Sequence, residues 1–267
     1  MVATRKLIVP ALVGAALLIA LAGWAVARGV SGHRGTPTAS RVAAAPAALL
    51  TAEQVYQRYG QGVVEVIGAS AAGAGGTRAI DNGNGARGLG FAVSRALILT
   101  SARLVDRHGS IDKTATVIFR AGGAQTRRVV GAIVCVDATL DLAVIRVDPA
   151  RATGLVVLPM GDSSALRAGQ SLTALGDPLA ASPTLAGFTV SAPRRALRAT
   201  SGATMQAVVL AGDPLAGGQS GAPLFDASGR VLAVVDVVGP AAGGPGSVGS
   251  AVPINDAAHV IADSLAN

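Results

Sequence analysis

The residues with the clearest capacity for chemistry lie in one octapeptide, residues 217–224, with the sequence GGQSGAPL. It places Ser220 among glycines and other small residues. Glycines beside a serine let the chain approach a substrate carbonyl closely and direct backbone N–H groups at it. The stretch is therefore a candidate nucleophile loop. Taken alone, it is equally compatible with a glycine-rich surface turn in which Ser220 has no role.

The charge distribution argues against a nucleic-acid partner. The formal net charge is +7, but the basic residues up to position 48 have no acids among them, and the remainder of the chain is nearly balanced. The excess charge therefore flanks an apolar segment and does not form a groove-lining patch. Arg194, Arg195 and Arg198 form the densest cluster in the body, where we expect a solvated strand end or loop.

The N-terminal region predicts a membrane segment. Residues 7–27 carry no charge and follow Arg5 and Lys6, and the run reaches the roughly 20 residues that a helix needs to cross a bilayer. We expect residues 1–6 to be cytoplasmic, 7–27 to be a single transmembrane anchor and the rest to be extracytoplasmic. A cleaved signal peptide is the alternative, because residues 25–27 have the small-x-small form of a cleavage site, and the domain would then be secreted. Residues 28–48 predict a flexible linker.

From residue 49 onward the pattern predicts an all-β domain. Thr51 and Gln54 form a capping-box pattern that opens a short helix to about residue 59. Two sets of strand-like runs follow and predict a pair of β-barrels, at about 62–148 and 170–253, before a helical pattern at 254–265. The strand candidates are 63–67, 90–93, 96–100, 115–119, 127–136 and 142–147, then 171–175, 185–191, 205–210, 222–225, 231–238 and 250–252.

Four stretches resemble, in the same order, segments of the HtrA-like, trypsin-fold serine proteases. Residues 88–93 (GLGFAV) with 97–102 (LILTSA) are similar to G-x-G-F…I-L-T-x-A-H, and 137–144 (DATLDLAV) to D-x-x-x-D-L-A-V. Residues 218–224 (GQSGAPL) are similar to G-N-S-G-G-P-L, and 252–255 (VPIN) to A-I-P-I-N. The resemblance covers about 49–265. It implies two six-stranded antiparallel Greek-key barrels with a short N-terminal and a C-terminal helix; the family's C-terminal PDZ module is not expected here.

The resemblance also assigns roles to individual residues. It implies that Ser220 is the nucleophile, that Asp141 is the orienting acid, and that the backbone N–H groups of Gly218 and Ser220 form the oxyanion hole. Asp137 is expected to be a turn residue. The position of the family's catalytic histidine is occupied by Arg103.

Arg103 cannot perform the task of that histidine. A serine hydroxyl is a poor nucleophile until a neighbouring base takes its proton. A guanidinium is protonated at any physiological pH and has no acceptor lone pair. Arg103 can instead form a charge-assisted pair with Asp141, and we expect that ion pair to plug the former active site.

The chain offers few replacements for the missing base. His33 lies in the linker, and His259 lies on the terminal helix, which we expect on the back of the second barrel. His108 follows Arg103 by five residues and would have to fold back to reach Ser220.

A different hydrolase fold can be weighed against this one. Ser220, Asp236 and His259 follow the chain order of α/β-hydrolase triads. That fold requires a strand–turn–helix at the nucleophile, whereas strand-like runs follow Ser220.

No cofactor or metal is expected, since scattered histidines and a single cysteine make no metal site. Cys135 is the single cysteine of the sequence, so an intrachain disulfide is excluded. We expect it to be a buried, inert thiol. The sequence thus predicts a membrane-anchored, extracytoplasmic trypsin-like domain with an incomplete triad, a catalytically impaired module that binds peptides or unfolded envelope proteins or regulates them. An active serine endopeptidase that cleaves through Ser220 with low activity is the alternative. A purely structural envelope protein is a third possibility.

Overall fold

The computed structural model describes residues 49–68, 86–107, 110–121, 125–177, 179, 185–198, 202–213, 217–236 and 249–266. The predicted cytoplasmic end, anchor and linker at residues 1–48 lie outside this part of the chain. Among the residues described, no helix combines the length and the apolar character needed to cross a membrane. Residues 45–267 form one compact unit, which contains every element described below.

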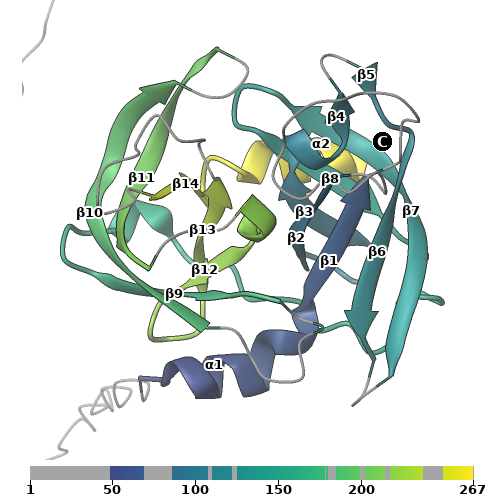
Figure 1. Ribbon diagram of the computed structural model, residues 1–267, viewed down its shortest axis with the longest axis horizontal. Helices are drawn as coiled ribbons and strands as arrows, with labels where there is room; N and C mark the ends of the chain where they lie inside the picture. Colours follow the sequence, from purple (N-terminus) through teal and green to yellow (C-terminus); the bar gives the residue numbers. More distant parts are fainter. Residues whose placement is uncertain are drawn as a thin grey trace, which may run out of the picture. The chain divides into compact units, whose positions relative to one another are not determined.

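The first half of this unit is a closed antiparallel barrel (Figure 1). The strands lie around it in the order β1-β2-β3-β8-β7-β6. Runs of Val, Ile and Leu form these strands because branched side chains pack well on a pleated, largely buried surface. A separate two-stranded hairpin, β4–β5, follows β3. The bounds are β1 Val63–Gly68, β2 Arg87–Ala92, β3 Leu97–Ser101, β4 Asp106–Arg107, β5 Ser110–Ile111, β6 Thr114–Arg120, β7 Thr126–Asp137 and β8 Leu142–Arg146.

The second half forms another closed barrel, with the strand order β10-β11-β14-β13-β12-β9. Its core contains Phe188, Leu210 and Leu224, each nearly inaccessible to solvent. The all-β, trypsin-like class predicted from the sequence is therefore confirmed. The bounds are β9 Ser171–Leu175, β10 Leu185–Arg198, β11 Thr204–Gly212, β12 Pro223–Phe225, β13 Val231–Asp236 and β14 Gly249–Pro253.

Helix α1 (Ala52–Tyr59) begins as the sequence predicts. Thr51 Oγ1 accepts from Gln54 N at 3.2 Å, and Gln54 Oε1 accepts from Thr51 N at 2.9 Å, which is a complete capping box. The helix precedes the first barrel in sequence but contacts the second. Tyr59 stacks on Phe225 of β12 with ring centroids 5.8 Å apart.

Helix α2 (Ala258–Ala266) differs from its prediction in both start and position. It begins four residues later than expected, because the preceding residues form turns that are fixed by backbone hydrogen bonds such as Asp256 N to Pro253 O, 3.0 Å. The helix contacts β7 and β8 of the first barrel, where Arg146 donates to the backbone oxygen of Ser264. The expectation that His259 lies on the back of the second barrel is therefore wrong.

Candidate functional site

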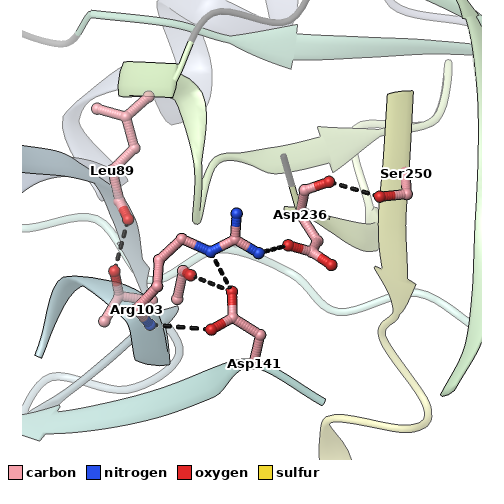
Figure 2. Close-up of polar contacts among 7 residues, drawn as sticks. Leu89, Arg103, Asp141, Asp236 and Ser250 are labelled. Carbon is pink, nitrogen blue, oxygen red and sulfur yellow. Dashed lines mark hydrogen bonds and ion pairs between the residues drawn. The ribbon is translucent and has the colours of Figure 1, made fainter. Parts of the chain in front are cut away.

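Arg103 and Asp141 are held against each other at the edge of the first barrel. β3 ends at Ser101 and passes into a single 3₁₀ turn, η2 (Ala102–Leu104), which carries Arg103. Arg103 binds Asp141 twice, through its backbone N to Oδ1 at 2.9 Å and through its Nε to Oδ2 at 2.6 Å (Figure 2). Ser101 Oγ donates to the same Oδ2 at 2.5 Å. The predicted pairing of Arg103 with Asp141 is present.

Asp141 has an unusual backbone conformation for a side-chain-bearing residue. It lies just before β8 with φ of 54°, a left-handed geometry that aspartate tolerates better than most residues. Its carbonyl accepts from Ala102 N at 2.9 Å, and the residue is only 7% exposed. Such a conformation costs of order 1 kcal/mol or more and persists where several contacts fix it together. The contacts with residues 101–103 supply that fixation.

Arg103 also reaches the second barrel. Its Nη2 contacts Oδ1 of Asp236, the last residue of β13 (Figure 2). Asp236 is 2% exposed, and its backbone oxygen accepts from Ser250 Oγ of β14 at 2.6 Å. Its second carboxylate oxygen, Oδ2, is buried and makes no hydrogen bond in the described part of the chain.

Sequence reasoning gave Asp236 no role in a trypsin-like site. The one usable signal was a carboxylate inside a strand-like apolar run, since a charge buried in a strand requires a partner. Burial raises the pKa of Asp236 to about 7. The positive charge of Arg103 opposes the rise, while the neighbouring Asp141 carboxylate adds to it.

Ser220 lies in a tightly packed turn that follows the 3₁₀ segment η4 (Gly217–Gln219). The residue is 1% exposed, and its Oγ has no hydrogen-bond partner among the described residues. Its backbone oxygen accepts from Leu89 N of β2 at 2.8 Å. Gly221, with φ of +88°, allows this approach, because a Cβ there would lie 2.0 Å from Leu89 O.

The predicted oxyanion donors, the N–H groups of Gly218 and Ser220, lie within and directly after η4. The hydrogen bonds of a 3₁₀ turn do not determine where the N–H groups of its first residues point. The oxyanion hole therefore stays a prediction.

Two other groups named from the sequence lie apart from Arg103. Asp137, expected to be a turn residue, is the last residue of β7 and caps the turn that follows: its Oδ1 accepts from Thr139 N and Leu140 N at 2.8 and 3.0 Å. Its Oδ2 lies 2.9 Å from Nε2 of His259. Burial alone would raise the pKa of Asp137, but these hydrogen bonds hold it below its usual value.

Two further candidates have no place in the described site. His108 lies outside the described residues. Cys135 is only partly buried on β7, and its burial raises the pKa of the thiol. Within the described ranges, no cluster of His, Cys, Asp and Glu side chains is arranged to hold a metal ion.

The structure thus brings Arg103, Asp141 and Asp236 together. It does not connect Ser220 to them by any hydrogen bond of the described residues. A serine hydrolase needs hydrogen bonds that connect its nucleophile to a base and that base to an acid. In this structure, Asp141 is bound by the guanidinium of Arg103.

Comparison with known proteins shows which family the domain around this site resembles. The sequence model of the trypsin-like peptidase domain matches residues 88–234. A probable periplasmic serine endoprotease, DegP-like, of Halomonas elongata is 32% identical over 181 residues, which cover 67% of this chain and 35% of that protein. The mitochondrial serine protease HTRA2 of Drosophila pseudoobscura pseudoobscura is 34% identical over 149 residues, covering 55% and 33%. The chain therefore spans about a third of the length of the curated relatives it matches.

Solved structures agree on the fold. The crystal structure of Deg5 matches with a TM-score of 0.58 and 24% identity, covering 77% of this chain and 89% of that one. An HtrA-type protease with a tripeptide matches with a TM-score of 0.61 and 19% identity, covering 80% and 63%. At these identities the structures support the fold alone. Because the family model matches more than half of its length, the chain belongs to the trypsin-like peptidase family, and its curated homologues include HtrA-type serine proteases.

Proposed function

We propose that this domain is a catalytically impaired member of its family, a peptide- or protein-binding or regulatory module at the cell envelope. One observation carries the proposal: the side chain bound to Asp141 is the guanidinium of Arg103, which also contacts Asp236. A guanidinium in contact with two carboxylates stays protonated. It offers no lone pair to take the proton of Ser220.

The expected loss of activity is large. Loss of one triad member in a serine protease leaves about 10³–10⁴-fold acceleration over water, from substrate binding and the oxyanion hole. The geometry at Ser220 supports the same conclusion, because its hydroxyl is buried without a hydrogen-bond partner among the described residues.

Binding of peptide segments is the part of the family's chemistry that needs no base. The curated relatives are named as proteases, and one structural neighbour is described with a tripeptide. We therefore propose segments of unfolded or envelope proteins as the partners of this domain. We further propose that residues 7–27 anchor it in the cell membrane with the domain extracytoplasmic, or that it is secreted after cleavage; fractionation of cells separates these two cases.

Labelling with a fluorophosphonate probe tests the absence of catalysis. We expect the full-length protein to label no faster than the Ser220→Ala variant. Arg103→His restores an imidazole beside Asp141 and is expected to raise Ser220-dependent labelling above the wild-type level. Arg127→His, which replaces an exposed arginine on β7, is the matched control and should change nothing.

The alternative is a serine endopeptidase of low activity. The specific observation in its favour is that Ser220 and Asp141 are both present in a fold whose curated homologues are serine proteases. Fast, Ser220-dependent labelling of the wild type would establish this alternative and overturn the impaired assignment. Absence of both labelling and peptide binding, in a folded protein, would leave a structural role.

A further inference from the structure

Arg103 contacts an acid of each barrel, and the barrels also share a hydrophobic cluster, to which Val144 of β8 and Val234 of β13 belong. Asp141 belongs to the first barrel, just before β8, and Asp236 ends β13 of the second. A single guanidinium contacts both carboxylates (Figure 2). The side chain of Arg103 is 15% exposed and those of Asp141 and Asp236 are 9% and 2% exposed, so the cluster is screened little by solvent. A change in its charge therefore acts directly on the contact between the barrels.

The cluster contains more negative than positive groups. Two carboxylates share one arginine, so full ionisation leaves a surplus negative charge in a buried place. The strands paired with β13 supply no titratable side chain to offset it: β12 is Pro-Leu-Phe, and β14 contributes Ser250 to the backbone oxygen of Asp236. In the described structure, the charged groups that face Asp236 are therefore Arg103 and Asp141. One proton shared by the two acids makes the cluster neutral.

We propose that the cluster of Asp141, Arg103 and Asp236 is a proton-operated latch between the two barrels, closed while the acids hold one proton and loosened when they release it. The step is a simple ionisation: the carboxyl of Asp236 gives its proton to water and no covalent bond changes. The loosened form has a buried anionic oxygen, Asp236 Oδ2, without a hydrogen bond from the described residues. Water entering between the barrels would supply that bond, at the cost of packing.

The pKa of about 7 for Asp236 places this release near neutral pH. The contact that should report it is the hydrogen bond from Leu89 N of β2 to Ser220 O, because it crosses between the barrels close to the cluster. The inference goes beyond the proposed function, since it holds whether or not the domain binds peptides. It also predicts that the packing around Ser220 depends on pH.

Hydrogen exchange of the full-length protein tests the latch. After correction for the intrinsic pH dependence of exchange, we expect protection of the Leu89 amide to fall by about tenfold or more between about pH 5.5 and about pH 8.5, with a midpoint near 7. The amide of Val235, which donates to Ala222 O inside the second barrel, is the internal control and should keep its protection. Equal protection of Leu89 at both pH values would overturn the proposal.

Variants separate the latch from other titrations. Asp236→Asn cannot ionise, so its Leu89 amide should stay protected at both pH values. Asp148→Asn, which removes an exposed acid in the turn after β8, should keep the wild-type step. A step that survives in Asp236→Asn would contradict the assignment.

If Asp236→Asn does not fold, the wild type still decides the question. Carboxyl ¹³C resonances of its aspartates should then include one that titrates near pH 7. A spectrum in which every aspartate titrates below about pH 5 would overturn the latch.

Discussion

Arg103 contacts two acids that come from different barrels, Asp141 and Asp236. Each carboxylate alone would be a buried, uncompensated charge. Such charges are costly, and removal of one partner of a buried pair is typically worse than absence of both. Arg103 is therefore expected to stabilise the fold.

Arg103→Ala tests that role. The variant leaves Asp141 and Asp236 buried without their cation, and we expect the free energy of unfolding at about pH 8 to fall by about 3–5 kcal/mol. Chemical denaturation followed by circular dichroism gives this quantity. The same change in an Asp236→Asn background should cost less, because one of the two orphaned charges is gone. Equal stability of Arg103→Ala and wild type would show that the ion pair contributes nothing.

At the level of elements, the turn that holds Ser220 is fixed by its packing on β2. Gly221 takes a positive φ and lies so close to Leu89 that a side chain has no room. The hydrogen bond from Leu89 N to Ser220 O closes the same contact. The position of Ser220 is therefore determined by a neighbouring barrel as well as by its own turn.

Gly221→Ala should destabilise the protein for two reasons, backbone strain and a clash with Leu89 O at 2.0 Å. Gly169→Ala is the matched control, since Gly169 has a similar φ of +82° and nothing within 4 Å of an added Cβ. We expect a loss of about 1 kcal/mol at Gly169 and a clearly larger one at Gly221, of roughly 2–4 kcal/mol. Thermal unfolding of both variants measures the difference. Similar losses of stability in the two variants would mean that β2 moves away from residue 221 at little energetic cost.

The strands of both barrels were largely predictable, because their residues alternate or cluster in short apolar runs between glycine-rich turns. β9, Ser171–Leu175, was predicted with the bounds that it has. β10 was expected to end at residue 191 but continues to Arg198, past Pro193. Two shifts in its pairing with β11, between Val190 and Arg195, accommodate the interruption. Such irregularities depend on the partner strand and are not visible in a single run.

The site was predictable where both partners of a contact lie in recognisable motifs, and not where one partner lies outside them. The pairing of Arg103 with Asp141 followed from two segments with recognisable patterns. Asp236 lies 133 positions from Arg103, and only the folded chain brings it to the guanidinium. The position of α2 on the first barrel is a second tertiary effect of this kind.

At the scale of the whole molecule, the two barrels share a hydrophobic cluster, and further contacts lie at separate places around it. Helix α1 contacts the second barrel through Tyr59, and the nearby Leu50 N donates to Ala227 O at 2.7 Å. The cluster around Arg103 provides an ionic contact elsewhere in the chain. The contact of Tyr59 with Phe225 is insensitive to pH. The contact of Arg103 with Asp236 changes its charge near neutral pH, because the pKa of Asp236 is about 7. Global stability should therefore follow pH through the cluster.

The sign of that dependence is opposite to the usual one for an acid in an ion pair. The pKa of Asp236 is about 7 in the folded protein and 3.8 as its ordinary value, so between these limits the folded state holds a proton that the unfolded state has released. The free energy of unfolding should therefore fall as pH rises from about 4 to about 7, by up to about 1.4 kcal/mol per pH unit, and level off above. The lowered pKa values of Asp137 and Asp162 act only at the acidic end of this window. Denaturant titrations of wild type and Asp236→Asn across the window give the two curves. The wild-type curve should slope downward and the variant's should be nearly flat, whereas a wild-type stability that rises toward pH 7 would show that Asp236 is ionised throughout.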